Sequence, residues 1–203
     1  MQNIKAIVKE IVDNFESLHP IPTGIKAQGQ IPFGIKAVLF DVYGTLLVSG
    51  VGEIGMSFMD SGSANVDSLL ENCGFPCRKK VSKNFTKIFK IVIAQHHRIL
   101  QKKGIDYPEV DIREVWSDIL NLLWKDAYLA KLPKYNEAVL EELALRYEAA
   151  INPLWPMPGF PHIVRTLVNA GILVGIVSNA QFYTPLFLEA FAGCPLTDLG
   201  IKE

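Results

Sequence analysis

Residues 35–46 read Ile-Lys-Ala-Val-Leu-Phe-Asp-Val-Tyr-Gly-Thr-Leu, and they indicate the class of fold. The first six form a short, mostly apolar run that contains the β-branched residues Ile35 and Val38, which is typical of a buried strand, and the run ends at Asp41. Tyr43-Gly44-Thr45 then turns the chain. Because ligands of α/β proteins bind beyond the carboxyl ends of strands, Asp41 is the first candidate for a functional residue.

A second strand of the same kind is predicted at 172–177, and Ser178-Asn179 follows it directly. We expect helices on either side of it, at 160–170 with Gly171 as the stop and at 184–192. Strands that alternate with helices predict a parallel sheet with helical crossovers. The carboxyl ends of parallel strands lie at one edge, so Asp41 and Ser178 are predicted to face the same crevice.

The rest of the chain is predicted to be mainly helical. A Gly- and Ser-rich loop is expected at 47–63, and helical periodicity runs from about 64 to 150. Within it, a helix over 81–103 should end at Gly104, and Asp111 should cap the next one. Further helices are expected at 135–149 and, as a leader, at 2–18.

These patterns predict an α/β fold with an inserted all-α subdomain. The boundaries are a helical leader and connector at 1–34, a discontinuous core at 35–46 and 153–203, and a helical insert at 47–152. The leader packs either on its own domain or on a second copy in a homodimer, and the sequence leaves this open.

Composition narrows the classes of partner. The chain has 203 residues, with 20 Lys and Arg against 21 Asp and Glu. Binding to a nucleic-acid backbone needs a concentrated cationic surplus, so we expect no nucleic-acid partner. The apolar runs are too short for a membrane span, which predicts no membrane partner and a soluble, cytoplasmic protein. Three cysteines without metal-site spacing are expected to be free thiols.

The residues at the two strand ends suit covalent catalysis on an anionic substrate. Asp41 can act as a nucleophile and form an aspartyl ester. Gly44 is expected to turn the chain so that backbone N–H groups form an anion-binding nest. The side chains of Thr45, Ser178 and Asn179 can orient the same anion.

Residues 40–46, Phe-Asp-Val-Tyr-Gly-Thr-Leu, resemble motif I of the haloacid dehalogenase superfamily. Val177-Ser178-Asn179 is similar to its motif II, and Pro158-Gly159 is similar to the lead-in of many members. The insert at 47–152 matches the position of the family's helical C1 cap. The resemblance implies a Rossmannoid core with a mobile lid, Asp41 as the nucleophile, and Thr45, Ser178 and Asn179 as ligands of the substrate.

Two departures from the family pattern bear on the chemistry. Phosphatases of the superfamily carry a second Asp where this chain has Tyr43, and a phenol with a pKa near 10 is a poor base at neutral pH. The Asp-x-Tyr-Gly-Thr form is similar to that of the 2-haloacid dehalogenase branch, whose halide leaving group needs no proton. No residue after Asn179 resembles the family's motif III lysine or motif IV acids.

The resemblance implies Mg²⁺ as cofactor if the protein is a phosphatase, held by the Asp41 side chain and the Tyr43 carbonyl, and no cofactor if it is a dehalogenase. Two oxygen ligands are too few to hold Mg²⁺ tightly. We therefore expect the C-terminal part of the core to lie beyond residue 203, the alternative being an inactive remnant.

The function expected from the sequence is hydrolysis of a small organic substrate through a covalent aspartyl intermediate, with a phosphate monoester or acyl phosphate as the first choice. One alternative is a metal-independent 2-haloacid dehalogenase, and another is a non-catalytic binding or regulatory protein. Tyr43 is included among the catalytic candidates. Gly44, His97 and Arg98 are the expected substrate-binding residues.

Overall fold

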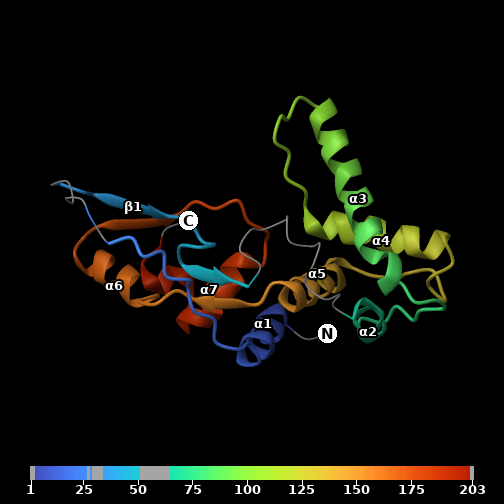
Figure 1. The fold of residues 1–203 in the computed structure, drawn as a ribbon, viewed down its shortest axis with the longest axis horizontal. Coiled ribbons are helices and arrows are strands. Elements are labelled where there is room, and N and C mark those ends of the chain that lie inside the picture. Colours follow the sequence, from blue (N-terminus) through green and yellow to red (C-terminus); the bar gives the residue numbers. More distant parts are fainter. Residues whose placement is uncertain (1–2, 27, 29–33, 51–64, 202–203) are drawn as a thin grey trace. The chain divides into compact units, whose positions relative to one another are not determined.

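The computed structural model describes residues 3–26, 28, 34–50 and 65–201 of the chain. These residues form a mixed α/β structure with seven α-helices and two small sheets (Figure 1). The chain divides into two compact units. One contains residues 5–54 and 152–203 and holds all the strands; the other contains residues 55–151, with residues 1–4, and is helical where it is described.

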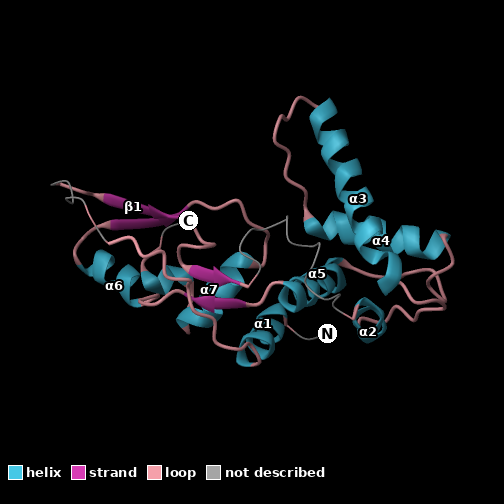
Figure 2. Cartoon of the chain, viewed as in Figure 1, coloured by secondary structure: helices cyan, strands magenta, loops and turns pink. Residues whose placement is uncertain are grey.

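The first unit contains a two-stranded parallel sheet. Strand β1 (Ala37–Phe40) pairs with β4 (Leu173–Ile176), with Ala37 opposite Leu173 and Phe40 opposite Ile176. Helix α6 (His162–Asn169) precedes β4, and Gly171, at a φ of +76°, ends that segment as expected. The predicted parallel pairing is therefore confirmed, and Figure 2 shows the two strands side by side.

The prediction that both runs are buried strands is wrong for one face of the sheet. Leu39 is 68% exposed and Leu173 is 54% exposed, and both belong to the face that also carries Ala37. Val174, which points to the opposite face, is buried. One face of the sheet is thus packed against the core, and the other is covered by none of the residues that the structure describes.

A second, antiparallel sheet was not predicted. Strand β2 (Leu47–Ser49) pairs with β3 (Leu154–Pro156) across the helical insert in the sequence. The loop expected at 47–63 is therefore partly strand, and its residues 51–64 lie outside the described ranges. Gly50 donates its N–H to the Pro153 carbonyl (2.9 Å), and a Cβ at Gly50 would lie only 2.8 Å from the Pro153 ring. This close approach explains why glycine ends β2.

Helix α1 (Ile4–Asp13) packs on α7 (Thr184–Ala192) within the first unit. Ile7 and Val8 are buried, and the ring of Phe15 stacks on that of Phe187 with centroids 6.1 Å apart. Lys5 forms an ion pair with Glu189 at 2.8 Å. The leader helix therefore packs on its own chain, and its contact with a second copy in a homodimer stays a prediction.

The helical unit contains α2 (Val66–Asn72), α3 (Ser82–Lys102), α4 (Ile112–Lys125) and α5 (Glu137–Ile151). Its core is an aromatic cluster in which neighbouring ring centroids lie 5.2–6.1 Å apart. The members of the cluster are Phe85, Phe89, Trp116 and Tyr147. Among the described residues, no helix is both long and apolar enough to cross a membrane.

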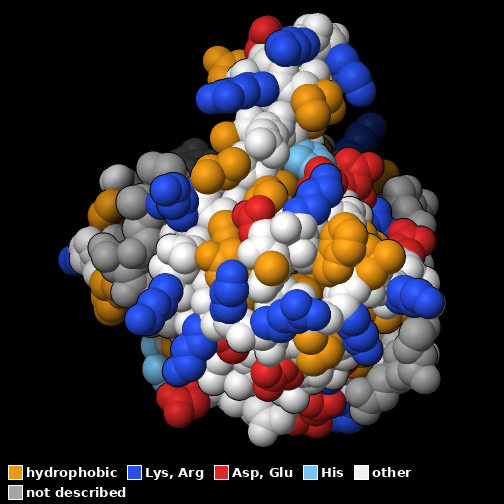
Figure 3. Space-filling view, turned by 90° about the vertical axis from the view of Figure 1, so that its right-hand side faces the viewer, with side chains coloured by type: hydrophobic (Ala, Val, Ile, Leu, Met, Phe, Trp, Pro, Cys, Tyr) orange, Lys and Arg blue, Asp and Glu red, His pale blue; other side chains and the backbone are white. Residues whose placement is uncertain are grey.

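The ends of these helices follow the sequence signals closely. Asp111 caps α4 by accepting the N–H of Arg113 at 2.8 Å, and Gly104 follows α3 at a φ of +87°. Figure 3 shows Lys and Arg side chains over the part of the surface formed by α3, at the top of the view. Of the basic run that precedes this helix, Arg78 donates to the Ala130 carbonyl (3.0 Å) and Lys79 lies over the Tyr128 ring.

Candidate functional site

The parallel register brings the two predicted halves of the site to one edge of the sheet. Phe40 and Ile176 are the last paired residues, and the Val177 N–H donates to the Phe40 carbonyl (2.9 Å). Asp41 therefore leaves β1 where Ser178 and Asn179 leave β4. Asp41 and Asn179 are exposed and Ser178 is half-buried, so all three lie within reach of solvent.

The turn after Asp41 is closed by its own backbone. The Val42 carbonyl accepts three N–H groups, from Thr45 (3.1 Å), Leu46 (2.7 Å) and Leu47 (2.9 Å). The Gly44 N–H donates to the Leu47 carbonyl at 2.8 Å, and Gly44 has a φ of +77°, which favours glycine. The predicted nest therefore does not form from the amides of Gly44 and Thr45, because both N–H groups already have partners inside the turn.

Apolar side chains of this turn anchor it to the core. Val42, Leu46 and Leu47 are buried, and the Leu46 carbonyl accepts the N–H of Met157 at 2.9 Å. Thr45 is exposed on the same turn. The alternation of buried and exposed residues keeps the Asp41 carboxylate and the Thr45 hydroxyl at the surface while the backbone between them is fixed.

Tyr43 does not project into solvent. Its ring is half-buried, and its hydroxyl is hydrogen-bonded to the Thr184 hydroxyl at 2.8 Å. Thr184 is the first residue of α7 and is only 2% exposed. Sequence reasoning placed Tyr43 in the site but missed Thr184, whose available signal was its position at a helix start soon after Ser178-Asn179.

A cavity of about 430 Å³ adjoins the β4 end of the site. Ser178, Gln181 and Thr184 contribute its polar groups, and its remaining walls are mainly apolar. Asp41 is not among the residues that line it. Ser178 thus belongs both to the edge that carries Asp41 and to this cavity.

The residues present do not complete a magnesium site. Asp41 and the Tyr43 carbonyl supply two oxygens, whereas Mg²⁺ prefers six ligands in octahedral geometry. Within the described ranges, no group of three or more His, Cys, Asp or Glu side chains is placed to hold a metal ion. The described residues therefore do not fit Mg²⁺ without further ligands.

The two candidates from the insert, His97 and Arg98, lie on α3 in the helical unit. His97 is half-buried and Arg98 is exposed. The neighbouring His96 bonds to the Asp118 carboxylate of α4 through Nε2 at 2.9 Å. Contact of His97 or Arg98 with a substrate stays a prediction, since Asp41 belongs to the other unit.

Two of the cysteines, Cys73 and Cys77, are not activated nucleophiles. All three are free thiols. Burial, with a smaller contribution from Glu142, raises the pKa of Cys73 to about 11. Burial and the carboxylate of Asp67 likewise raise the pKa of Cys77 to about 11. Little of either thiol is ionised at neutral pH, and the thiolate is the reactive form.

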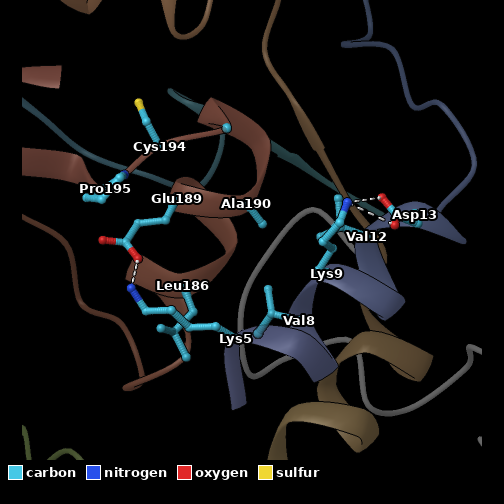
Figure 4. A pocket seen from close by; sticks show the side chains of 11 residues that line it. Lys5, Val8, Lys9, Val12, Asp13, Leu186, Glu189, Ala190, Cys194 and Pro195 are labelled. Atoms are coloured by element: carbon cyan, nitrogen blue, oxygen red, sulfur yellow. Dashed lines mark hydrogen bonds and ion pairs between the residues drawn. The ribbon is translucent and has the colours of Figure 1, made fainter. Parts of the chain in front are cut away.

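A second cavity of the same unit, of about 470 Å³, lies between α1 and α7. Figure 4 shows its two ion pairs, Lys5 with Glu189 and Lys9 with Asp13, beside the apolar side chains of Val8 and other residues. None of the predicted site residues lines this cavity. It is therefore separate from the site at the strand ends.

The solved structures that this chain resembles include two whose likeness to it is weak. One is the crystal structure of a dehalogenase, with a TM-score of 0.33 and 16% identity over 85% of this chain and 62% of that one. The other is that of a predicted phosphoglycolate phosphatase from Haemophilus somnus 129PT, with a TM-score of 0.33 and 14% identity over 81% and 60%. This chain thus spans about three fifths of each matched structure.

No family model and no curated protein matches the sequence. A structural similarity this weak does not indicate the activity of this chain.

Proposed function

We propose that this protein is a hydrolase of the haloacid dehalogenase type that acts through a covalent aspartyl intermediate at Asp41. The observation that supports the proposal is the shared edge of β1 and β4, because Asp41 follows β1 and Ser178-Asn179 follows β4 at this edge. A carboxylate beside a hydroxyl and an amide on rigid strand ends is suited to nucleophilic attack on a bound anion.

In the proposed reaction, an Asp41 carboxylate oxygen forms a bond to phosphorus as the bond to the leaving group breaks. Water then hydrolyses the aspartyl phosphate and regenerates the carboxylate. Because the Gly44 and Thr45 amides are engaged in the turn, the donors to the anion are the side chains of Thr45, Ser178 and Asn179. We propose a phosphate monoester or an acyl phosphate as the substrate. No step is assigned to Mg²⁺, because the described residues do not complete its site.

The second candidate is metal-independent hydrolysis of a 2-halo acid. One observation favours it: a tyrosine occupies the position of the second acid, and its hydroxyl is bonded to Thr184. Halide leaves without a proton, so this chemistry loses nothing by the substitution. Here Asp41 attacks carbon, halide departs with the bonding electrons, and water hydrolyses the ester.

The test is turnover of acetyl phosphate, 4-nitrophenyl phosphate and 2-chloropropionate by the full chain, each with Mg²⁺ and with EDTA. Asp41→Asn should reduce turnover to the background of the buffer. Because Asp41 is exposed, we expect the thermal unfolding of the Asp41→Asn variant to match that of the wild type. Asp198→Asn, which alters another exposed acid of the same unit, is the matched control and should retain activity.

The outcome separates the candidates. Phosphate release that needs Asp41 supports the phosphatase, whereas chloride release that persists in EDTA supports the dehalogenase. Turnover that Asp41→Asn leaves intact would contradict a covalent role for this residue.

A further inference from the structure

We infer that Thr184 is a positioning residue that holds the Tyr43 hydroxyl out of proton transfer, and that the site therefore serves substrates whose leaving group departs as a stable anion. The part of this inference that concerns substrates rests on the proposed function. The part that concerns the hydrogen bond between Tyr43 and Thr184, called the clamp below, does not.

The anchor of the clamp is rigid. Thr184 is almost fully buried, and its N–H donates to the Gln181 carbonyl at 3.0 Å. The helix that it begins is held in the core by Phe187 and Leu188, both buried. The Thr184 hydroxyl therefore cannot shift away from Tyr43 without movement of a packed helix start.

The clamp is a side-chain hydrogen bond that connects the turn after Asp41 to α7. The Val42 carbonyl and the bond between Leu46 and Met157 fix the turn through backbone groups, which most sequences could provide. The bond from Tyr43 to Thr184 joins residues 141 positions apart and needs two particular hydroxyls. It connects the turn after Asp41 to the helix that follows Ser178-Asn179, so it links the two halves of the candidate site.

The clamp also limits the chemistry. A phenol is a weak acid at neutral pH, and in the inferred arrangement Tyr43 donates its proton to the Thr184 oxygen, 2.8 Å away, so that this proton is already engaged. Without a proton donor at this position, the bond to the leaving group must break with the electron pair going to a stable anion. The carboxylate released from an acyl phosphate meets this condition, as does a halide, whereas the alkoxide of a simple alkyl phosphate does not.

The first experiment compares leaving groups with the full chain. General acid catalysis contributes on the order of 10²–10⁴-fold. We therefore expect kcat/KM for glycerol 2-phosphate to lie that far below the value for acetyl phosphate, with the ratio unchanged in Tyr43→Phe. Tyr43→Asp, which restores an acid, should raise the value for the alkyl ester. Similar rates for both substrates, with selective loss of the alkyl ester in Tyr43→Phe, would overturn the inference.

The second experiment tests the clamp without turnover. Tyr43→Phe and Thr184→Val should each lower the equilibrium constant for folding in urea, roughly 2- to 12-fold for a hydrogen bond of this kind. The double variant should be no worse than the more severe single variant, and Thr184→Ser should restore most of the loss. Tyr107→Phe, at a tyrosine that is 94% exposed, is the matched control and should change nothing.

The outcomes distinguish the two proposals. Losses that multiply in the double variant, or a Thr184→Ser variant that behaves like Thr184→Val, would disprove the clamp. If the clamp is found but no substrate is hydrolysed, the proposed function and the substrate class fail together, while the structural role of Thr184 stands.

Discussion

At the scale of single residues, buried polar groups hold the strand ends in place. The Val42 carbonyl gathers three amides, and Ser49 on β2 donates its hydroxyl to the Asn152 side-chain oxygen at 2.7 Å. Asn152 is only 2% exposed. A buried polar group that loses its partner keeps the full cost of its desolvation, so such bonds matter more than their number suggests.

We expect Asn152→Ala to lower the free energy of unfolding by about 1–3 kcal/mol, because the half-buried Ser49 hydroxyl loses its acceptor and a buried side chain is removed. Urea unfolding followed by circular dichroism measures the change. Asn169→Ala, at an exposed asparagine of the same unit, should stay within about 0.5 kcal/mol of the wild type. Equal effects of the two substitutions would show that the hydrogen bond between Ser49 and Asn152 contributes nothing to the free energy of unfolding.

At the scale of elements, the cap of α4 also joins it to α5. Asp111 accepts the Arg113 N–H and pairs with the Arg113 side chain, which in turn reaches Glu137 on α5 at 2.8 Å. The side-chain hydrogen bond from Arg113 lowers the pKa of Asp111 below its usual value. Folding thus favours the ionised form of Asp111. Its contribution to the free energy of unfolding is lost as the pH falls through the lowered pKa.

We expect Asp111→Ala to reduce stability by about 0.5–2 kcal/mol at pH 7, the usual cost of removing a cap. Because the pKa is lowered in the folded state, the contribution is complete above about pH 4, the value for an unfolded chain. The difference between variant and wild type should therefore shrink from pH 5 to pH 2. Urea titrations at each pH test this, with Glu109→Ala, an exposed acid nearby, as the control. A difference that is constant with pH would contradict it.

The packing of α1 on α7 gives a second expectation at this scale. Ile7→Ala should cost about 2–5 kcal/mol, as for other buried isoleucines, because it opens a cavity where α1 meets the core. Ile25→Ala, at a residue that is largely exposed, should cost little. Thermal unfolding of the full chain compares them. A small loss for Ile7→Ala would mean that α1 is only loosely held.

At the scale of the whole molecule, each of the two units has its own apolar core. In the helical unit the aromatic cluster is buried together with Ile119, Leu120 and Leu123 of α4. In the other unit the buried set includes Leu47, Leu154, Val174 and Phe187. A unit that buries its own apolar surface meets the main requirement for folding alone.

We therefore expect a fragment of residues 65–151 to fold on its own, with a helical circular dichroism spectrum and one cooperative thermal transition. Phe85→Ala should abolish the transition or lower it strongly, because removal of a buried phenylalanine costs about 3–5 kcal/mol, a large share of the stability of a small domain. Thr86→Ala, at an exposed neighbour, is the control. A fragment without cooperative unfolding would show that this core depends on the rest of the chain.

What the sequence alone determined about this protein is what depends on neighbours along the chain. Periodicity and end signals predicted α7 at its exact limits, the Asp111 cap and the stop of α3 before Gly104. The apolar runs before Asp41 and Ser178 predicted two strands, and the rules for crossover connections predicted their parallel pairing. These features need only local propensity and a general rule of topology.

Only the tertiary structure decided how distant segments meet. It paired Leu47–Ser49 with Leu154–Pro156, left Leu39 exposed, and engaged the amides of Gly44 and Thr45 within their own turn. It also brought the Tyr43 hydroxyl to Thr184, across 141 positions of sequence. No local pattern encodes such contacts, because they depend on the register of the sheet and on the packing of α7. Both result from the packing of the whole unit.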